Sequence, residues 1–230
     1  MIKLIKEVAG TMMRNFYSVL IINIAFLYSF DVLAKNELTD LTFVDSALSS
    51  CITEQAKKHN WLTINEIHTL KCHGMEITSI AGLDKLAHLK SLSLFNNKLE
   101  TIDLRSFNQL EYINISNNKL NTIYLTGLSH LKTLYLFKNN LSTIDFTGLS
   151  KLLKIRITHN QLSFLDISPL ISLEKAYFFD NKLEELIVAG LPKLTFIEVR
   201  QNPMPDEVYD RYDALEGITI VHDGNADDWK

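Results

Sequence analysis

The residues that could carry out catalysis or bind a metal ion are scattered along this chain. Its seven histidines do not cluster, and no nucleophile elbow, phosphate-binding loop, HExxH zinc motif or calcium-binding loop occurs. His159 and Asp180 hold equivalent positions of a 21-residue repeat, which should place them about 5 Å apart on neighbouring coils. Such a pair could bind a metal ion, but a solvated polar pair is the better interpretation. The sequence therefore predicts a protein that is not an enzyme and uses no cofactor or metal.

Non-covalent binding has a clearer signal, in six aromatic and four basic residues. Aromatic side chains and arginine are enriched at the energetic centres of protein interfaces. The ten candidate partner-binding residues share one side of a predicted sheet: Tyr112, Tyr135, Phe137, Lys154, Arg156, Lys175, Tyr177, Phe179, Phe196 and Arg200. The alternative is that the rings only cover one another along the sheet, a cross-strand effect of about 0.2–1 kcal/mol. We favour binding, because an exposed patch of this kind more often marks a partner site.

The assignment of these residues to one face depends on the repeat. Its most regular members are six asparagines spaced 21 residues apart: Asn97, Asn118, Asn139, Asn160, Asn181 and Asn202. Around each stands the pattern Leu-x-x-Leu-x-Leu-x-x-Asn-x-Leu, with other apolar residues replacing some leucines. In its Leu-x-Leu portion, the two apolar side chains point to one side of a strand and the residue between them to the other. A fixed period of this length is typical of a solenoid, whose stacked repeats bury a continuous core.

This pattern resembles the leucine-rich repeat family, in particular its short extracellular members of bacterial type. The resemblance covers residues 67–204, and six consecutive repeats keep nearly every position of the frame. It implies an α/β solenoid: a right-handed coil of repeats with a parallel β-sheet on its concave face, a helical N-terminal cap and a short C-terminal cap. The ten candidate residues would then lie on the concave face.

The six asparagines are predicted to be structural. Where each strand ends, backbone groups lose their strand partners inside a narrow coil, and an amide side chain offers both donors and acceptors. Each asparagine can therefore satisfy its own turn and that of the next coil, at about 1 kcal/mol net per hydrogen bond.

Residues 1–34 have the composition of a cleaved signal peptide. Basic residues precede an apolar run over 16–30, and Val32 and Ala34 suit signal-peptidase cleavage before Lys35. The alternative is an uncleaved membrane anchor, but this run is shorter than the roughly 20 residues that span a bilayer. We therefore expect an exported protein, periplasmic or secreted, without stable membrane insertion after cleavage.

Residues 35–66 lack the repeat and are predicted to form the N-terminal cap. Thr42 with Asp45 resembles a capping box, and apolar residues at helical spacing predict a helix over about 43–58. This helix would cover the open apolar edge of the first repeat. Cys51 on the helix and Cys72 on the first strand are an even pair in an exported protein, which favours a disulfide over a metal site or a reactive thiol.

Residues 205–223 are predicted to form the C-terminal cap, and 224–230 a frayed tail. A short helix is expected over 207–214. The stretch 215–220 matches the frame once more, 21 residues after the preceding repeat, which predicts a final edge strand with Thr219 beside Glu198.

Composition narrows the kind of partner. A net charge of −4 gives no reason to expect a nucleic-acid binder, which is usually strongly basic. The leading hypothesis is an exported, non-catalytic recognition module that binds a protein through its concave face. Basic candidate residues on an acidic chain favour an acidic region on that protein. The alternative is a glycan or cell-wall binder whose sugars stack on the aromatic rings.

Overall fold

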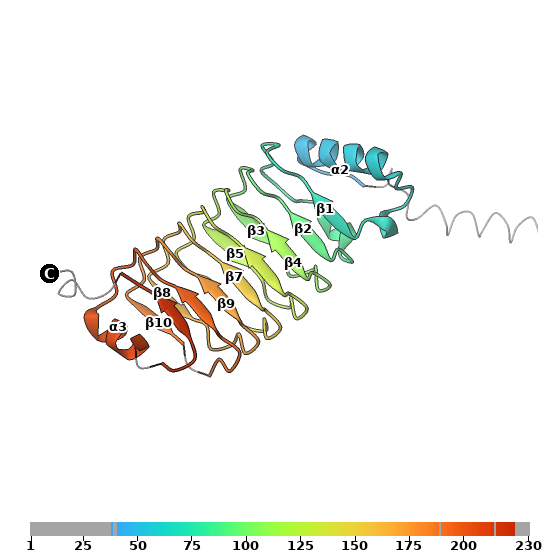
Figure 1. The fold of residues 1–230 in the computed structure, drawn as a ribbon. Helices are drawn as coiled ribbons and strands as arrows, with labels where there is room; N and C mark the ends of the chain where they lie inside the picture. Colours follow the sequence, from blue (N-terminus) through green and yellow to red (C-terminus); the bar gives the residue numbers. More distant parts are fainter. Residues whose placement is uncertain (1–37, 39–40, 189, 214, 224–230) are drawn as a thin grey trace, which may run out of the picture. The chain divides into compact units, whose positions relative to one another are not determined.

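The computed structural model describes residues 38, 41–188, 190–213 and 215–223 (Figure 1). The predicted signal peptide and the predicted tail lie outside these residues. The described residues from Leu41 to Asp223 form one compact unit. Among the residues described, no helix is both long enough and apolar enough to cross a membrane.

Eight short parallel strands, one from each coil, form a single sheet that we call the concave sheet (Figure 1). In sheet order they are β1 (Thr69–Lys71), β2 (Ser91–Ser93), β4 (Tyr112–Asn114), β6 (Thr133–Tyr135), β7 (Lys154–Arg156), β9 (Lys175–Tyr177), β11 (Phe196–Glu198) and β12 (Thr219–Val221). From β2 to β11, residues 21 positions apart stand side by side, as Leu134 does with Ile155. The predicted solenoid with a parallel sheet is confirmed.

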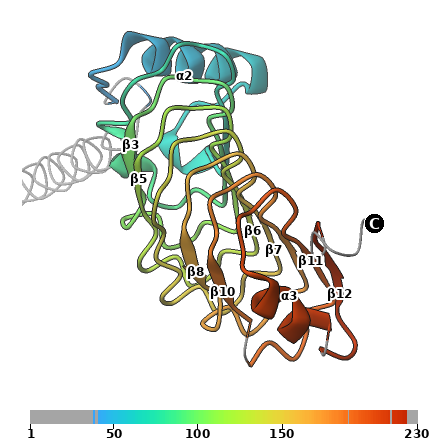
Figure 2. The same ribbon diagram turned by 90° about the vertical axis from the view of Figure 1, so that its left-hand side faces the viewer.

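The opposite wall, which we call the convex wall, carries two smaller parallel sheets. In one, β3 (Thr101–Asp103) pairs with β5 (Thr122–Tyr124); in the other, β8 (Phe164–Asp166) pairs with β10 (Glu185–Ile187). Figure 2 shows these four strands across the coil from β6, β7, β11 and β12. Apolar side chains from both walls fill the space between them, and the largest fully buried ones are Phe107, Phe146 and Phe178. A single coil could not bury both sets, so stacking is what makes the core.

The asparagines form a hydrogen-bonded column inside the coil. Asn139 is typical: its Oδ1 accepts from the Leu120 N–H (3.0 Å), and its Nδ2 donates to the carbonyls of Ile115 (3.0 Å) and Leu136 (3.1 Å). Leu120 and Ile115 belong to the preceding coil, so the bonds run backward along the chain, not forward as predicted. The residue before each asparagine, such as Lys138, has a φ between 54 and 58°. This left-handed conformation turns the chain away from the sheet.

The N-terminal cap is helix α2 (Ser46–His59), followed by the short 3₁₀ helix η3 (Ile64–Glu66); a second one, η4 (Leu83–Leu86), lies in the first coil. The predicted capping box was wrong, because Asp45 itself is the cap and the helix begins at Ser46. One oxygen of Asp45 accepts from the N–H groups of Ala47 and Leu48 (2.9 and 3.0 Å). The other accepts from the Thr78 N–H (2.7 Å) and so ties the helix to the first coil. The two oxygens of a carboxylate can each accept from a different segment, whereas a threonine side chain has a single oxygen.

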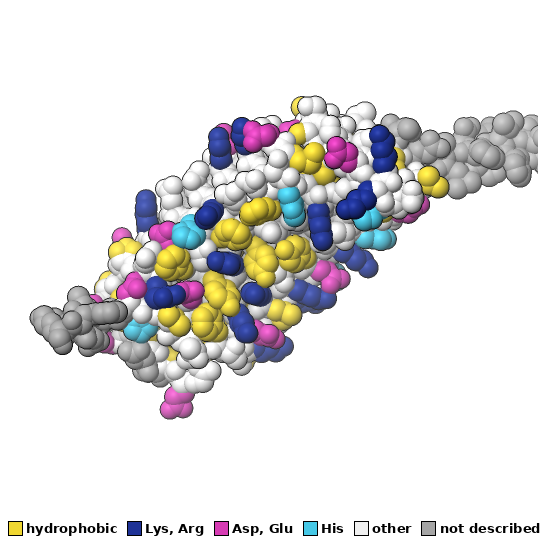
Figure 3. All heavy atoms as spheres, turned by 45° about the horizontal axis from the view of Figure 1, so that its top comes forward, with side chains coloured by type: hydrophobic (Ala, Val, Ile, Leu, Met, Phe, Trp, Pro, Cys, Tyr) yellow, Lys and Arg dark blue, Asp and Glu magenta, His cyan; other side chains and the backbone are white. Residues whose placement is uncertain are grey.

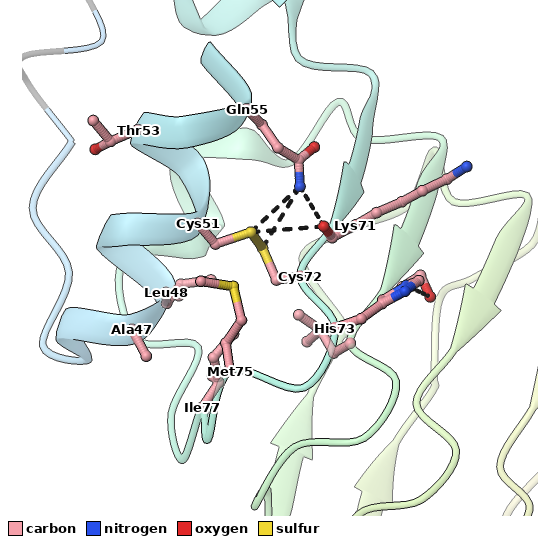
Figure 4. The surroundings of a disulfide bond; sticks show 12 residues. Ala47, Leu48, Cys51, Thr53, Gln55, Lys71, Cys72, His73, Met75 and Ile77 are labelled. Atoms are coloured by element: carbon pink, nitrogen blue, oxygen red, sulfur yellow. Dashed lines mark hydrogen bonds between the residues drawn. A yellow bond between two sulfur atoms is a disulfide. The ribbon is translucent and has the colours of Figure 1, made fainter. Parts of the chain in front are cut away.

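A disulfide between Cys51 and Cys72 fastens α2 to the end of β1, as predicted (Figure 4). The two Cα atoms are 5.7 Å apart. The side chain of Gln55 reaches over the disulfide and donates to the Lys71 carbonyl. In the chain-entropy estimate, a crosslink over a loop of this length stabilises the fold by about 3 kcal/mol.

The C-terminal cap consists of helix α3 (Asp206–Asp213) and strand β12. The hydroxyls of Tyr209 and Tyr212 donate to the carbonyls of Asn202 (3.0 Å) and Leu186 (3.1 Å), which anchors the helix. The predicted register of β12 was wrong: Thr219 stands beside Phe196, not beside Glu198. Because α3 lies between β11 and β12, paired residues of these two strands are 23 positions apart instead of 21. A register shift of two residues leaves every side chain on the same face, so the apolar pattern fits both registers.

Candidate functional site

The ten predicted binding residues lie on the outward side of the concave sheet, in three columns that cross the strands. The column at the strand starts holds Tyr112, Lys154, Lys175 and Phe196; the column at the strand ends holds Tyr135, Arg156 and Tyr177; the column two residues further on holds Phe137, Phe179 and Arg200. Figure 3 shows hydrophobic side chains gathered on one face with Lys and Arg between them. The regular register is what brings residues up to 88 positions apart onto this surface.

Aromatic rings on this surface contact one another across the strands. Tyr112 meets Tyr135 edge to face, with ring centroids 5.8 Å apart, and Tyr177 meets Phe196 at 5.2 Å. Phe137 lies 6.1 Å from Phe95, which was not among the ten predicted residues. Phe95 stands in the same column as Phe137, so the frame alone contained the signal needed to include it. The rings form a connected surface instead of separate exposed side chains.

Three of the basic side chains lie over aromatic rings. The Lys154 ammonium sits between two tyrosines, 5.7 Å from the ring centroid of Tyr135 and 5.6 Å from that of Tyr177. The Arg156 guanidinium lies 5.0 Å above the Phe137 ring. Arg200 lies 5.8 Å from the Phe179 ring in the same way. Each cation–π contact contributes about 0.5–1 kcal/mol at an exposed site, and it fixes where the charge is presented.

The basic residues differ in whether an acidic side chain compensates their charge. Arg200 donates to Glu198 through Nε (2.9 Å) and also through Nη2. Lys154, Arg156 and Lys175 have no carboxylate within ion-pair distance among the residues that the structure describes. The middle of the concave sheet therefore carries uncompensated positive charge on a chain whose net charge is −4.

A hollow of about 340 Å³ opens between these side chains. It is lined by Tyr135, Phe137, Lys154, Arg156, Tyr177 and Glu198. Its volume is at the low end of the range of small-molecule sites, about 300–1,000 Å³. Glu198 was missed by the sequence prediction, because nothing in the repeat distinguishes an acidic residue that holds a neighbouring arginine from one that faces solvent.

Two hydroxyl groups are buried beneath this surface. Ser116 (0% exposed) stands in the column between Phe95 and Phe137, and Thr158 (2% exposed) between Phe137 and Phe179. Neither hydroxyl oxygen has a hydrogen-bond partner within the described part of the chain. A buried hydroxyl without a partner costs about 1–3 kcal/mol. The column that contains Phe137 and Phe179 would therefore be more stable with apolar residues in place of Ser116 and Thr158.

His159 and Asp180, the pair that could have bound a metal, bond to each other. His159 Nδ1 lies 2.5 Å from Asp180 Oδ2, and both side chains are partly exposed. No group of three or more His, Cys, Asp or Glu side chains that could hold a metal occurs in the described residues. The His159 ring also meets Phe179 edge to face at 5.3 Å, which places the pair at the border of the aromatic surface.

Comparison with known proteins agrees with this geometry. Residues 87–141 match the family model described as leucine-rich repeat. The fold of the described residues is that of a leucine-rich repeat solenoid. The concave surface of such a solenoid is where proteins of this architecture commonly bind their partners.

Solved structures similar to this chain include two internalins of Listeria monocytogenes strain 4b F2365. Internalin InlF has 20% identity and a TM-score of 0.57 over 84% of this chain, which spans 66% of that protein. Internalin C2 has 23% identity and a TM-score of 0.54 over 82% of this chain and 98% of its own. TLR13, solved in complex with ssRNA13, has 22% identity and a TM-score of 0.51 over 60% of this chain and 22% of its own. At these identities the similarity concerns the fold alone, and no curated protein matches in sequence.

Proposed function

We propose that this leucine-rich repeat protein is an exported, non-catalytic recognition module that binds a protein partner through its concave sheet. The observation that carries the proposal is the hollow in the middle of the sheet, where uncompensated Lys154 and Arg156 stand among connected aromatic rings. Such a cluster has the composition of an interface hot spot.

The same cluster argues against rings that serve only to cover one another. A surface selected for stability would pair its cations and would not bury the hydroxyls of Ser116 and Thr158 without partners. Both features are tolerated where a surface is kept for a ligand.

A protein partner is favoured over a glycan because cations already occupy ring faces. Sugars stack on a free, flat aromatic face, but Lys154 lies between the rings of Tyr135 and Tyr177, and Arg156 covers one face of Phe137. Protein side chains can instead contact ring edges and the charged groups together.

Two observations support export. Residues 1–34 have the composition of a signal peptide. The disulfide between Cys51 and Cys72 is of a kind that persists in oxidising compartments. Mass spectrometry of the protein recovered from the periplasm or the culture medium should give an N-terminus at Lys35; recovery of the uncleaved chain in the membrane fraction would refute this part of the proposal.

The binding proposal is tested by affinity capture from a native extract with the triple variant Tyr135→Ser, Arg156→Ser, Tyr177→Ser. The convex wall offers a matched control, Arg105→Ser, Tyr124→Ser, Phe164→Ser, which also removes one arginine and two aromatic residues. We expect the concave variant to lose the captured protein and the convex variant to retain it. Thermal unfolding followed by circular dichroism checks that both variants fold, and equal capture by both would overturn the assignment of the site.

A further inference from the structure

We infer that Lys154 and Arg156 form a receptor for a carboxylate side chain, so that the partner is a protein segment with an acidic residue beside an apolar one. This inference rests on the proposed function of the concave sheet and specifies what the sheet recognises.

The first step of the argument is the charge balance inside the hollow. Lys154 and Arg156 line it, and Glu198 is the one acidic side chain among its described lining residues. Glu198 is held by two groups of Arg200, and only 17% of its side chain is exposed. The charge of Glu198 is therefore compensated by Arg200. Lys154 and Arg156 have no acidic partner of their own in the hollow and can bind one that a ligand supplies.

Some other basic residues of the described chain do pair with an acidic residue nearby. Arg105 pairs with Asp103, and Lys132 with Glu111 on the preceding coil, each at 2.6 Å. The coils on either side of β7 instead place aromatic residues beside Arg156: Tyr135 and Tyr177 hold the neighbouring positions. Aromatic residues therefore occupy the two positions at which an acidic residue could have paired with Arg156.

The second step is the geometry of the two cations. They are two residues apart on β7, so both side chains leave the same face of the sheet, with Cα atoms about 6.6 Å apart. Arginine offers a fork of donors that matches both oxygens of a carboxylate, and lysine adds a compact point charge. Arg156 is exposed and Lys154 half-buried, so a carboxylate from outside can reach both.

The third step concerns the apolar part of the ligand. Tyr135, Phe137 and Tyr177 form the walls of the hollow next to the two cations. A segment that presents an aliphatic or aromatic side chain beside its acid can fill the space along these rings while the acid reaches Lys154 and Arg156. Charge complementarity and apolar contact then come from adjacent residues of one peptide.

Selection from a random twelve-residue phage-displayed peptide library on the protein purified from cells that express the full chain tests this inference. We expect enriched peptides to carry Asp or Glu next to an aliphatic or aromatic residue. Synthetic copies of these peptides should bind at least about tenfold more weakly to the double variant Lys154→Met, Arg156→Met than to the wild type. The control Lys182→Met removes an exposed lysine from outside the hollow and should leave the affinity unchanged. A peptide whose acidic residue is changed to Gln should bind the wild-type protein as weakly as the acidic peptide binds the double variant. The Gln peptide should bind the double variant with little further loss of affinity.

The outcomes separate this inference from the proposed function. Enriched peptides without acids, whose binding is still lost in the concave triple variant, would overturn the carboxylate receptor and leave the binding surface in place. Peptides that bind the concave triple variant as well as the wild type would overturn both. A selection that enriches nothing, while a uronic-acid oligosaccharide binds and depends on Lys154 and Arg156, would show that the acid belongs to a glycan and would overturn the protein partner.

Discussion

The concave sheet and the convex wall carry the same residue types in different arrangements. On the convex wall, Tyr124 and Phe164 are 48% and 49% exposed, and Arg105, which lies over Tyr124, is compensated by Asp103. On the concave sheet, the rings are partly buried against one another, and Lys154 lies between two of them without an acid. The two walls therefore differ in the contacts among these residues and in the compensation of their charges, not in composition.

The difference follows from how far each wall is continuous. The concave sheet has a strand in every coil, so each residue of a column has the next residue of that column as its neighbour. On the convex wall the pairs β3–β5 and β8–β10 are separated by a coil in which residues 143–145 form no strand. Tyr124 and Phe164 belong to different sheets there and cannot build a shared surface.

The largest effect is expected from the scaffold that joins the two walls. Asn139→Ala would leave the Leu120 N–H and the carbonyls of Ile115 and Leu136 without their side-chain partner, at a cost of about 3–5 kcal/mol in the free energy of unfolding. Asn140→Ala, at an exposed neighbouring position, should change it by less than about 0.5 kcal/mol. Urea unfolding followed by circular dichroism measures both. Equal effects would mean that the walls do not depend on the asparagine column.

A smaller effect should separate the walls themselves. Tyr135→Ala removes a ring that contacts Tyr112, and we expect a loss of about 1–2 kcal/mol in the free energy of unfolding. Tyr124→Ala removes a ring from the convex wall that is about half exposed and should cost about 0.5 kcal/mol. If the two losses are equal in the same unfolding assay, the connected concave rings contribute no more than scattered ones.

The smallest effect has the opposite sign. Ser116→Ala and Thr158→Val remove buried hydroxyls that have no partner in the described chain, so each should stabilise the fold by up to about 1 kcal/mol. Thr143→Val, at an exposed position of the convex wall, should give no comparable gain. A loss of stability in both concave variants would mean that these hydroxyls are satisfied and that the third column is optimised for stability.

The sequence was sufficient for most of the fold because the period is constant where the core is continuous. Leu92, Ile113, Leu134 and Ile155 follow one another at 21 residues, and the strands pair in that register. It failed at β12, where alternating apolar residues at 218 and 220 fit two registers equally well. It also failed at Asp45, since a carboxylate that serves two segments cannot be recognised from local spacing.

The candidate surface could be predicted as a set of residues but not as an arrangement. The repeat assigns Lys154, Arg156 and Tyr177 to one face. The direction in which each side chain leans depends on neighbours from other coils. The cations over the rings and the pairing of Glu198 with Arg200 are contacts of that kind.

The backward direction of the asparagine bonds has a consequence for how such a chain can change in length. From Asn118 to Asn202, each asparagine bonds the same three backbone positions, one N–H and one carbonyl of the preceding coil and one carbonyl of its own. A tandem duplication or deletion of one 21-residue unit would therefore leave every amide with its full complement of partners. Each such event would move the aromatic surface by about 4.8 Å relative to the disulfide-fastened cap. Events outside the aromatic surface would thus change its distance from the cap in discrete steps and leave the residues of the proposed binding surface unchanged.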